Sequence, residues 1–318
     1  MTEPMARAER RFWAMGTDCH VVVRSSGGVT EAEMLLDLAE THVRELESLW
    51  SRFRDDSEVS RLNRGETVPL SAPTVALLRR ADDARTATLG WFDPFLAHTL
   101  AELGYDRTFD ELRGSGGSVP ATTDVIDPPT TRRPPIGEPL RTRSPLRFDA
   151  DRTTARLDDG AAFDPGGIGK GLAADLVSAE LVDRGAAGVL VNLGGDLRVR
   201  GNSGTEAWVI HVGNPFDETL PPIVELGITD CGLATSSPFR RRWHSPAGGA
   251  AHHILDPRNG APAAIEVASI TVTAPDAATA ELLTTAVMLS GPIHGKALLS
   301  RHDARAFVVR LDGTSGEL

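Results

Sequence analysis

Cysteine is scarce in this chain, and long apolar runs are absent. The 318 residues include only Cys19 and Cys231, so the sequence predicts no disulfide framework and is compatible with a reducing compartment. No apolar stretch approaches the roughly 20 residues that a membrane-spanning helix needs. The charged N-terminal residues 1–11 lack the apolar run of a signal peptide. We therefore expect a cytoplasmic protein without membrane insertion.

Positive charge is also in deficit. The 33 Lys and Arg residues are outnumbered by 44 Asp and Glu residues, which gives a formal net charge of −11. Nucleic acids and anionic membranes require a basic face, so neither is expected as a partner. An anionic ligand would have to be held by local dipoles or by a metal ion. The length and the 41% hydrophobic content are ordinary for a soluble globular protein with one large or two modest domains.

Lysine occurs only twice, in a chain that is otherwise rich in arginine. Lys170 lies in the segment 164–171 (Asp-Pro-Gly-Gly-Ile-Gly-Lys-Gly), and the other lysine is Lys296. A compact ammonium group beside exposed backbone amides is suited to a phosphate ester. The segment does not have the spacing of a P-loop. A tight turn before a helix is the alternative interpretation of these glycines.

Apolar residues at helical spacing predict four helices, over residues 30–50, 74–89, 171–184 and 277–289. The third helix directly follows the glycine-rich segment. Its N-terminal amides and its dipole would therefore favour an anion.

Segments with strand patterns are interspersed among these helices. Strands are predicted over residues 12–24, 208–212, 223–228, 269–273 and 306–311, and hairpins over 146–157 and 188–201. This mixture indicates an α+β protein with mostly antiparallel sheet. Residues 113–145 are rich in Gly, Pro, Ser and Thr, which indicates an irregular surface excursion or, alternatively, an interdomain linker.

The predicted helix 277–289 carries a carboxylate and a hydroxyl on one face. Glu281 and Thr285 are four residues apart, so their side chains are expected to lie about 6 Å from one another. Mg²⁺ prefers a few oxygen ligands of this kind. A solvated Glu and a space-filling Thr are the alternative.

Two adjacent histidines precede a turn. His252 and His253 are followed by Ile-Leu-Asp-Pro-Arg-Asn-Gly, residues 254–260. Adjacent histidines rarely chelate one zinc ion, so proton transfer or phosphate orientation is the better functional interpretation. A purely structural turn is the alternative. The run Arg240-Arg241-Arg242 is interpreted as a solvated basic patch near the ligand mouth, without a catalytic role.

Taken together, segments in collinear order over nearly the whole chain resemble the ApbE family, the FAD:protein FMN transferases. They are Met15-Gly16-Thr17, residues 51–63, Phe92-Asp93-Pro94, residues 164–175, residues 191–196, Ala234-Thr235-Ser236, residues 253–260, and the helix with Glu281 and Thr285. The resemblance implies one ApbE-like domain of T-fold-like architecture over residues 1–318, with the segment 113–145 as an excursion.

The resemblance also implies a reaction and a site. Members of this family bind FAD and Mg²⁺ and transfer FMN to a Thr or Ser hydroxyl of an acceptor flavoprotein, releasing AMP. Lys170 and His253 are implied as catalytic residues, and the metal would take the carbonyl of Gly167 with Glu281 and Thr285. Contacts to FAD are implied for Met15, Phe53, Arg54, Asp55, Asp93, Gly166, Lys170, His253 and Ile254.

Three positions depart from the family pattern. Glu281 replaces the usual metal-binding Asp, Ser237 replaces a Gly, and Pro165 replaces an aliphatic residue. Two other functions stay open on this basis. One is hydrolysis of FAD to FMN and AMP, and the other is FAD binding without catalysis.

Overall fold

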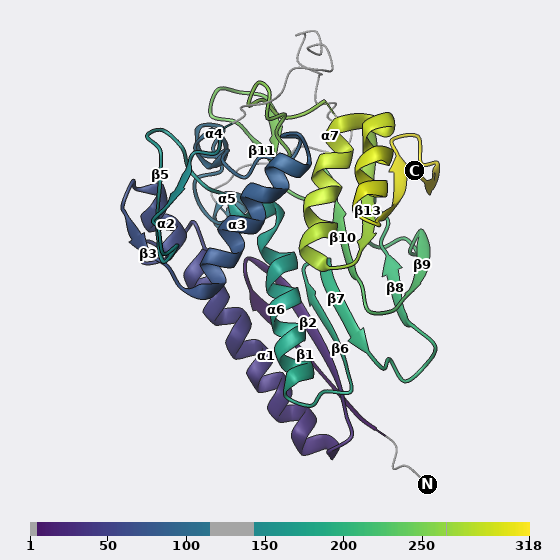
Figure 1. Ribbon diagram of the computed structural model, residues 1–318. Coiled ribbons are helices and arrows are strands. Elements are labelled where there is room, and N and C mark those ends of the chain that lie inside the picture. Colours follow the sequence, from purple (N-terminus) through teal and green to yellow (C-terminus); the bar gives the residue numbers. More distant parts are fainter. Residues whose placement is uncertain (1–4, 115–142, 265) are drawn as a thin grey trace.

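An antiparallel sheet of eight strands forms the centre of the computed structural model, which describes residues 5–114, 143–264 and 266–318 (Figure 1). All neighbouring strands of this sheet run antiparallel. In sheet order they are β1 (Ala6–Ala14), β2 (Thr17–Ser25), β6 (Gly188–Leu193), β7 (Asp196–Gly201), β10 (Gly232–Ser236), β13 (Val267–Ala274), β14 (Arg305–Arg310) and β15 (Ser315–Glu317). The predicted α+β class with mostly antiparallel sheet is confirmed.

Three long helices cover one face of this sheet. They are α1 (Gly28–Trp50), α6 (Gly169–Asp183) and α7 (Ala277–Arg301), and they lie side by side in Figure 1. Val21 and Val23 of β2 are fully buried in the core beneath them. Because side chains alternate along a strand, Val22 points to the opposite face.

A second, smaller layer covers that opposite face. The hairpin of β8 (Trp208–Val212) and β9 (Val224–Ile228) packs Trp208 and Ile228 against Val22 and Leu190. Strands β2 and β6 are therefore apolar on both faces, which explains their continuous hydrophobic runs.

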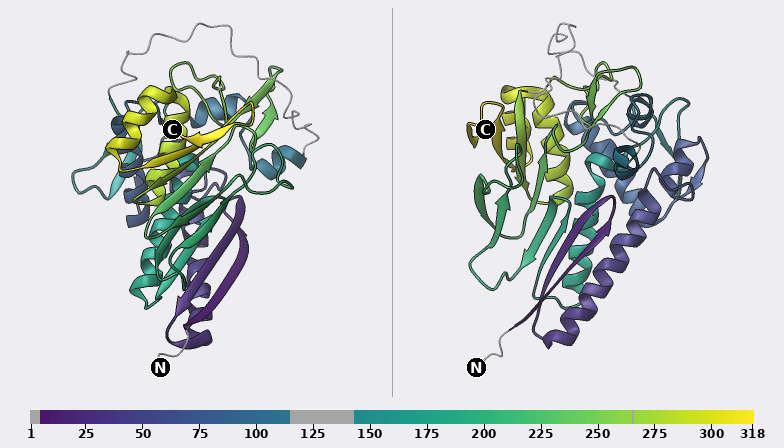
Figure 2. Two further views of the ribbon diagram at one scale, coloured as in Figure 1. Left: turned by 90° about the vertical axis from the view of Figure 1, so that its right-hand side faces the viewer. Right: turned by 180° about the vertical axis from the view of Figure 1, so that it is seen from behind.

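The remaining elements gather around the end of the three-helix layer where α6 begins (Figures 1 and 2). The helices are α2 (Glu58–Asn63), α3 (Ala72–Ala87), α4 (Ala97–Glu102), α5 (Phe109–Gly114) and the 3₁₀ turn η1 (Pro165–Gly167). The strands are β3 (Val68–Pro69), β4 (Leu146–Phe148), β5 (Thr154–Leu157), β11 (Arg242–His244) and β12 (Ala250–His252). No helix within the described ranges has both the length and the apolar character to cross a membrane.

The predicted helices and hairpins are confirmed with small shifts in their ends, but one strand prediction is wrong. Residues 12–24 do not form one strand, because Met15 and Gly16 turn the chain between β1 and β2. Both residues have positive φ, 52° and 64°, the conformation of a tight hairpin turn. The sequence offered no Asn-Gly or Asp-Gly signal for this turn.

Two further differences concern the C-terminal half. Helix α7 continues past residue 289, after a break at Gly291 (φ 74°, ψ 176°) followed by Pro292. Strand β10 was not predicted, although its residues 234–236 were part of the family resemblance. The predicted excursion 113–145 lies mostly outside the described residues, since residues 115–142 are not among them.

Candidate functional site

A cavity of about 860 Å³ opens where the start of α6 meets the β1–β2 turn, the β6–β7 turn and the middle of α7. This volume lies within the usual range of small-molecule sites. The structure brings most of the sequence-predicted residues together here. Those that line the cavity are Met15, Phe53, Asp93, Gly166, Gly167, Lys170, His253, Ile254, Glu281 and Thr285.

Arg54 and Asp55 lie elsewhere. Both are exposed, and neither is among the described residues that line the cavity. The Nε atom of Arg54 lies 3.5 Å from an oxygen of Asp56, also exposed. The neighbouring Arg52 lines the cavity instead, and the sequence offered no signal that distinguished it from Arg54 and Asp55.

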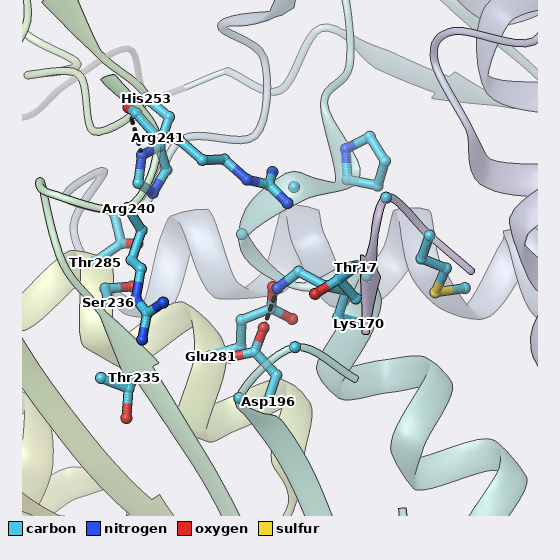
Figure 3. Close-up of a pocket in the computed structure, with 18 of the residues that line it drawn as sticks. Thr17, Lys170, Asp196, Thr235, Ser236, Arg240, Arg241, His253, Glu281 and Thr285 are labelled. Atoms are coloured by element: carbon cyan, nitrogen blue, oxygen red, sulfur yellow. Dashed lines mark hydrogen bonds and ion pairs between the residues drawn. The ribbon is translucent and has the colours of Figure 1, made fainter. Parts of the chain in front are cut away.

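A buried charge cluster occupies the floor of the cavity (Figure 3). Lys170 Nζ donates to the carboxylate of Asp196 and, at 2.9 Å, to Glu281 Oε1. Only 6% of the Asp196 side chain and 5% of the Glu281 side chain are exposed. The ammonium group expected to face open backbone amides is thus held between two carboxylates from β7 and α7.

The cluster alters the protonation of its members. Burial alone would lower the pKa of Lys170, but the carboxylates of Asp196 and Glu281 outweigh burial and raise it. Burial raises the pKa of Glu281, and the ammonium of Lys170 opposes that rise. Lys170 therefore stays charged and neutralises part of an otherwise costly buried negative charge.

Helices α6 and α7 cap each other, which fixes Glu281 in the cavity. Glu281 Oε2 accepts the backbone N–H of Gly171 at 2.7 Å, in the first turn of α6. In return, Asp175 of α6 accepts the N–H groups of Ala277 and Ala278, each at 2.9 Å, at the start of α7. Each carboxylate satisfies amides that have no partner within their own helix.

Glycine at position 171 allows this close crossing. A Cβ atom there would lie 2.4 Å from the carbonyl oxygen of Ala277. Gly171 thus serves helix packing, a role that neither the phosphate interpretation nor the tight-turn alternative included. Gly166 and Gly167 nevertheless line the cavity.

Three residues expected to hold a hard cation line the cavity, although both carboxylate oxygens of Glu281 already accept hydrogen bonds, from Lys170 and from Gly171. Glu281 supplies a carboxylate, Thr285 a hydroxyl and Gly167 a backbone carbonyl, and all three residues line the cavity. Such a donor set is typical of Mg²⁺. Within the described ranges, no cluster of three or more His, Cys, Asp or Glu side chains offers a metal site of another kind.

The two adjacent histidines have different surroundings. His252 is fully buried outside the cavity lining, with Nδ1 accepting the N–H of Ile254 at 3.2 Å and Nε2 at 3.1 Å from the carbonyl oxygen of Ala263. These contacts make His252 structural. His253 lines the cavity, and its Nδ1 lies 3.5 Å from the carbonyl oxygen of Arg241.

Burial, together with the nearby charge of Arg241, lowers the pKa of His253 well below its usual value. The imidazole is therefore neutral near pH 7. A carbonyl oxygen can only accept, so the contact with Arg241 requires the proton on Nδ1 and leaves Nε2 free to accept a proton.

Aromatic rings form one wall. Phe53 and Tyr105 lie with their centroids 5.8 Å apart, and the guanidinium of Arg52 lies over both rings, 4.2 and 4.6 Å from their centroids. Arg52 also donates to the carbonyl of Tyr105 at 2.9 Å, and its Nε lies 3.5 Å from Asp164.

Asp93 also lines the cavity and has its own partners. Its carboxylate lies 3.2 Å from Nε of Arg85 and accepts the N–H of Phe95 at 3.0 Å. Sequence reasoning missed the buried role of Asp196 and the cavity positions of Arg52 and Tyr105. Asp196 and Arg52 had a signal, because they lie in the segments 191–196 and 51–63 of the family resemblance. Arg241 was expected near the ligand mouth without a role, and it does line the cavity.

Comparison with known proteins identifies the family of this chain. Residues 15–308 match the ApbE family. The FAD:protein FMN transferase of Treponema pallidum is 28% identical over 302 residues, covering 90% of this chain and 79% of the relative. That of Vibrio cholerae is 26% identical over 296 residues, covering 89% and 81%.

Solved structures have the same fold. The crystal structure of the ApbE protein from Thermotoga maritima aligns with a TM-score of 0.79 at 25% identity, covering 98% of this chain and 97% of that one. The flavin transferase ApbE from Vibrio cholerae aligns with a TM-score of 0.76 at 21% identity, covering 99% and 97%. With the family match extending over nearly the whole sequence, this chain belongs to the ApbE family.

Proposed function

We propose that this protein transfers the FMN moiety of FAD to a Thr or Ser hydroxyl of an acceptor flavoprotein and releases AMP. The observation that carries the proposal is the convergence of Gly167, Lys170, His253, Glu281 and Thr285 on one cavity from distant parts of the chain. The relatives' shared name, FAD:protein FMN transferase, supports the same reaction.

In this reaction the acceptor oxygen forms a bond to the phosphorus of the FMN half. The bond between that phosphorus and the bridging oxygen breaks, and the bridging oxygen leaves with AMP. The hydroxyl proton must go to a base. His253 is proposed for this role, because its ring lines the cavity and the contact of its Nδ1 with the carbonyl of Arg241 leaves Nε2 as the free nitrogen.

The oxygen donors of Glu281, Thr285 and Gly167 would hold a Mg²⁺ ion, which supplies charge neutralisation for phosphate oxygens when bound. Glu281 Oε1 already accepts a hydrogen bond from Lys170. The ammonium group of Lys170 and the metal ion would therefore both interact with the carboxylate of Glu281. Asp196 remains as the second partner of Lys170.

Phe53 supports transfer over hydrolysis. Its ring belongs to the aromatic wall of the cavity with Tyr105, and such a wall limits the access of water to a reacting phosphate. We propose the cytoplasm as the location, as the sequence predicts.

The test is an acceptor-labelling assay. The protein is incubated with FAD, Mg²⁺ and a domain that carries an Asp-x-x-Thr-type acceptor, beside the same domain with the Thr replaced by Ala. A mass gain of one FMN on the Thr form alone would support the proposal. Free FMN without a mass gain would identify a hydrolase, and bound, unreacted FAD would identify a binding protein.

A further inference from the structure

The side chain of Arg241 places a guanidinium group in the cavity. The proposed reaction gives this group no role. It lies between β10 and β11, and its side chain is half-buried. Figure 3 shows it extending from the His253 side into the cavity, while the side chain of Arg240 runs in a different direction. Residues 240–242 are therefore not one solvated basic patch, because Arg241 is half-buried and Arg242 is buried, although Arg240 and Arg241 do line the cavity.

The other cations nearby have carboxylate partners. Lys170 is bound to Asp196 and Glu281. Arg52 has Asp164 at 3.5 Å, and the exposed Arg240 pairs with Glu218. Arg11 and Arg113 also line the cavity, but both are exposed to solvent.

Arg241 differs from these residues. Its guanidinium donates from Nη1 to the hydroxyl of Tyr105 at 3.2 Å, and no carboxylate of the described residues lies within ion-pair distance of it. A half-buried cation without a counter-ion is unfavourable. The hydroxyl of Tyr105 orients the group but does not neutralise its charge.

Tyr105 is itself firmly positioned. Its ring packs against Trp243 with centroids 5.2 Å apart and against Phe53 at 5.8 Å. The guanidinium is thus preorganised, which reduces the entropy lost when it binds a ligand. Its planar donors match two oxygens of a phosphate group.

We propose that Arg241 is the residue that binds the diphosphate of FAD, the role that the sequence had suggested for Lys170. This inference rests on the proposed function. It also links ligand binding to the base, because the carbonyl of Arg241 accepts the backbone N–H of His253 at 3.3 Å and contacts its ring nitrogen. One residue thus binds the phosphate and positions the imidazole.

The experiment compares Arg241→Gln with the control variant Arg184→Gln, at an exposed arginine that is not among the described residues lining the cavity. Dissociation constants are measured by titration calorimetry for FAD, for ADP and for riboflavin, which has no phosphate. Arg241→Gln is expected to weaken FAD and ADP binding by about 10- to 100-fold, since a charge-assisted bond to phosphate is lost. Riboflavin binding should not change, and Arg184→Gln should bind all three like the wild type.

Two further variants sharpen the test. Arg241→Lys keeps the charge without the planar donors and should restore only part of the affinity. Tyr105→Phe keeps the ring packing and removes the orienting hydroxyl, so a smaller loss, about 2- to 5-fold, is expected from one neutral hydrogen bond.

The assignment would be overturned if Arg241→Gln bound FAD and ADP with the same dissociation constants as the wild type. An equal loss of riboflavin binding would also overturn it, because that pattern indicates a structural role. Failure of the proposed function is distinguishable. If the wild type binds ADP through Arg241 but labels no acceptor, the assignment of Arg241 holds and the proposed transferase activity is wrong.

Discussion

Lys170 Nζ lies 2.9 Å from Glu281 Oε1, although the two residues are 111 positions apart in the sequence. The other oxygen of Glu281 accepts an amide of the helix that carries Lys170. Charge balance and helix packing are thus joined at one carboxylate. Substitution of Lys170 tests the charge balance, and substitution of Gly171 tests the helix packing.

Replacing Lys170 with Met should leave Asp196 and Glu281 as two buried carboxylates without a cation. We expect the free energy of unfolding to fall by about 3–5 kcal/mol. Mg²⁺ should raise the melting temperature of the variant more than that of the wild type, because the ion replaces the lost positive charge. Thermal unfolding with and without Mg²⁺ measures both effects.

Lys296→Met is the matched control, since Lys296 is the other lysine and is exposed on α7. It should unfold like the wild type. If Lys170→Met changed the free energy of unfolding as little as Lys296→Met does, the buried ion pairs of Lys170 would contribute little to stability.

Replacing Glu281 with Gln should weaken the proposed metal site while keeping the shape of the side chain. The Mg²⁺ concentration at half-maximal thermal stabilisation is expected to rise by about tenfold or more, because a charged ligand becomes neutral. Glu225→Gln, at an exposed carboxylate of β9, provides the control. An unchanged Mg²⁺ dependence would exclude Glu281 as a ligand.

His252 should make stability depend on pH. Burial lowers its pKa from 6.5 to about 4, so the unfolded chain binds a proton more readily than the folded one in that window. Its stabilising contribution is complete above pH 6.5 and is lost as the pH falls toward 4. The loss is on the order of 1–3 kcal/mol.

Urea unfolding of wild type and His252→Gln between pH 4.5 and 7.5 measures this effect. The variant should show a shallower fall in stability at acidic pH. His211→Gln, at an exposed histidine, should keep the wild-type slope. Parallel curves for wild type and His252→Gln would contradict the assignment.

Replacing Gly171 with Ala should separate α6 from α7. The new Cβ would lie 2.4 Å from the carbonyl oxygen of Ala277, so the helices must move and the reciprocal caps must lengthen. We expect a loss of about 2–4 kcal/mol, the range of overpacking combined with a weakened cap. Chemical denaturation checks it, and Gly316→Ala, with no atom within 4 Å of its Cβ position, is the control. An unchanged free energy of unfolding would mean that α6 and α7 can move apart at this contact without loss of stability.

Much of the fold followed from local patterns. The helical spacing of residues 30–50 and the hairpin at 188–201 were confirmed because each depends on contacts within its own segment. The turn at Met15 and Gly16 was missed, since its positive φ values come from the pairing of β1 with β2 and from the bond of Met15 N–H to Glu47 Oε1 at 2.7 Å. The sequence contains no residue that requires this turn.

The sequence by itself determined the family, because the order of the short motifs along the chain can be recognised without knowing which residues are in contact. Most of the residues that it implied for the site do line the cavity. Only the tertiary structure decided how their charges are paired. Lys170 meets Asp196 and Glu281, 26 and 111 residues away, whereas Arg241 meets no carboxylate of the described residues. Electrostatic energy depends on distance in space, and spacing along the chain does not encode that distance between separate elements.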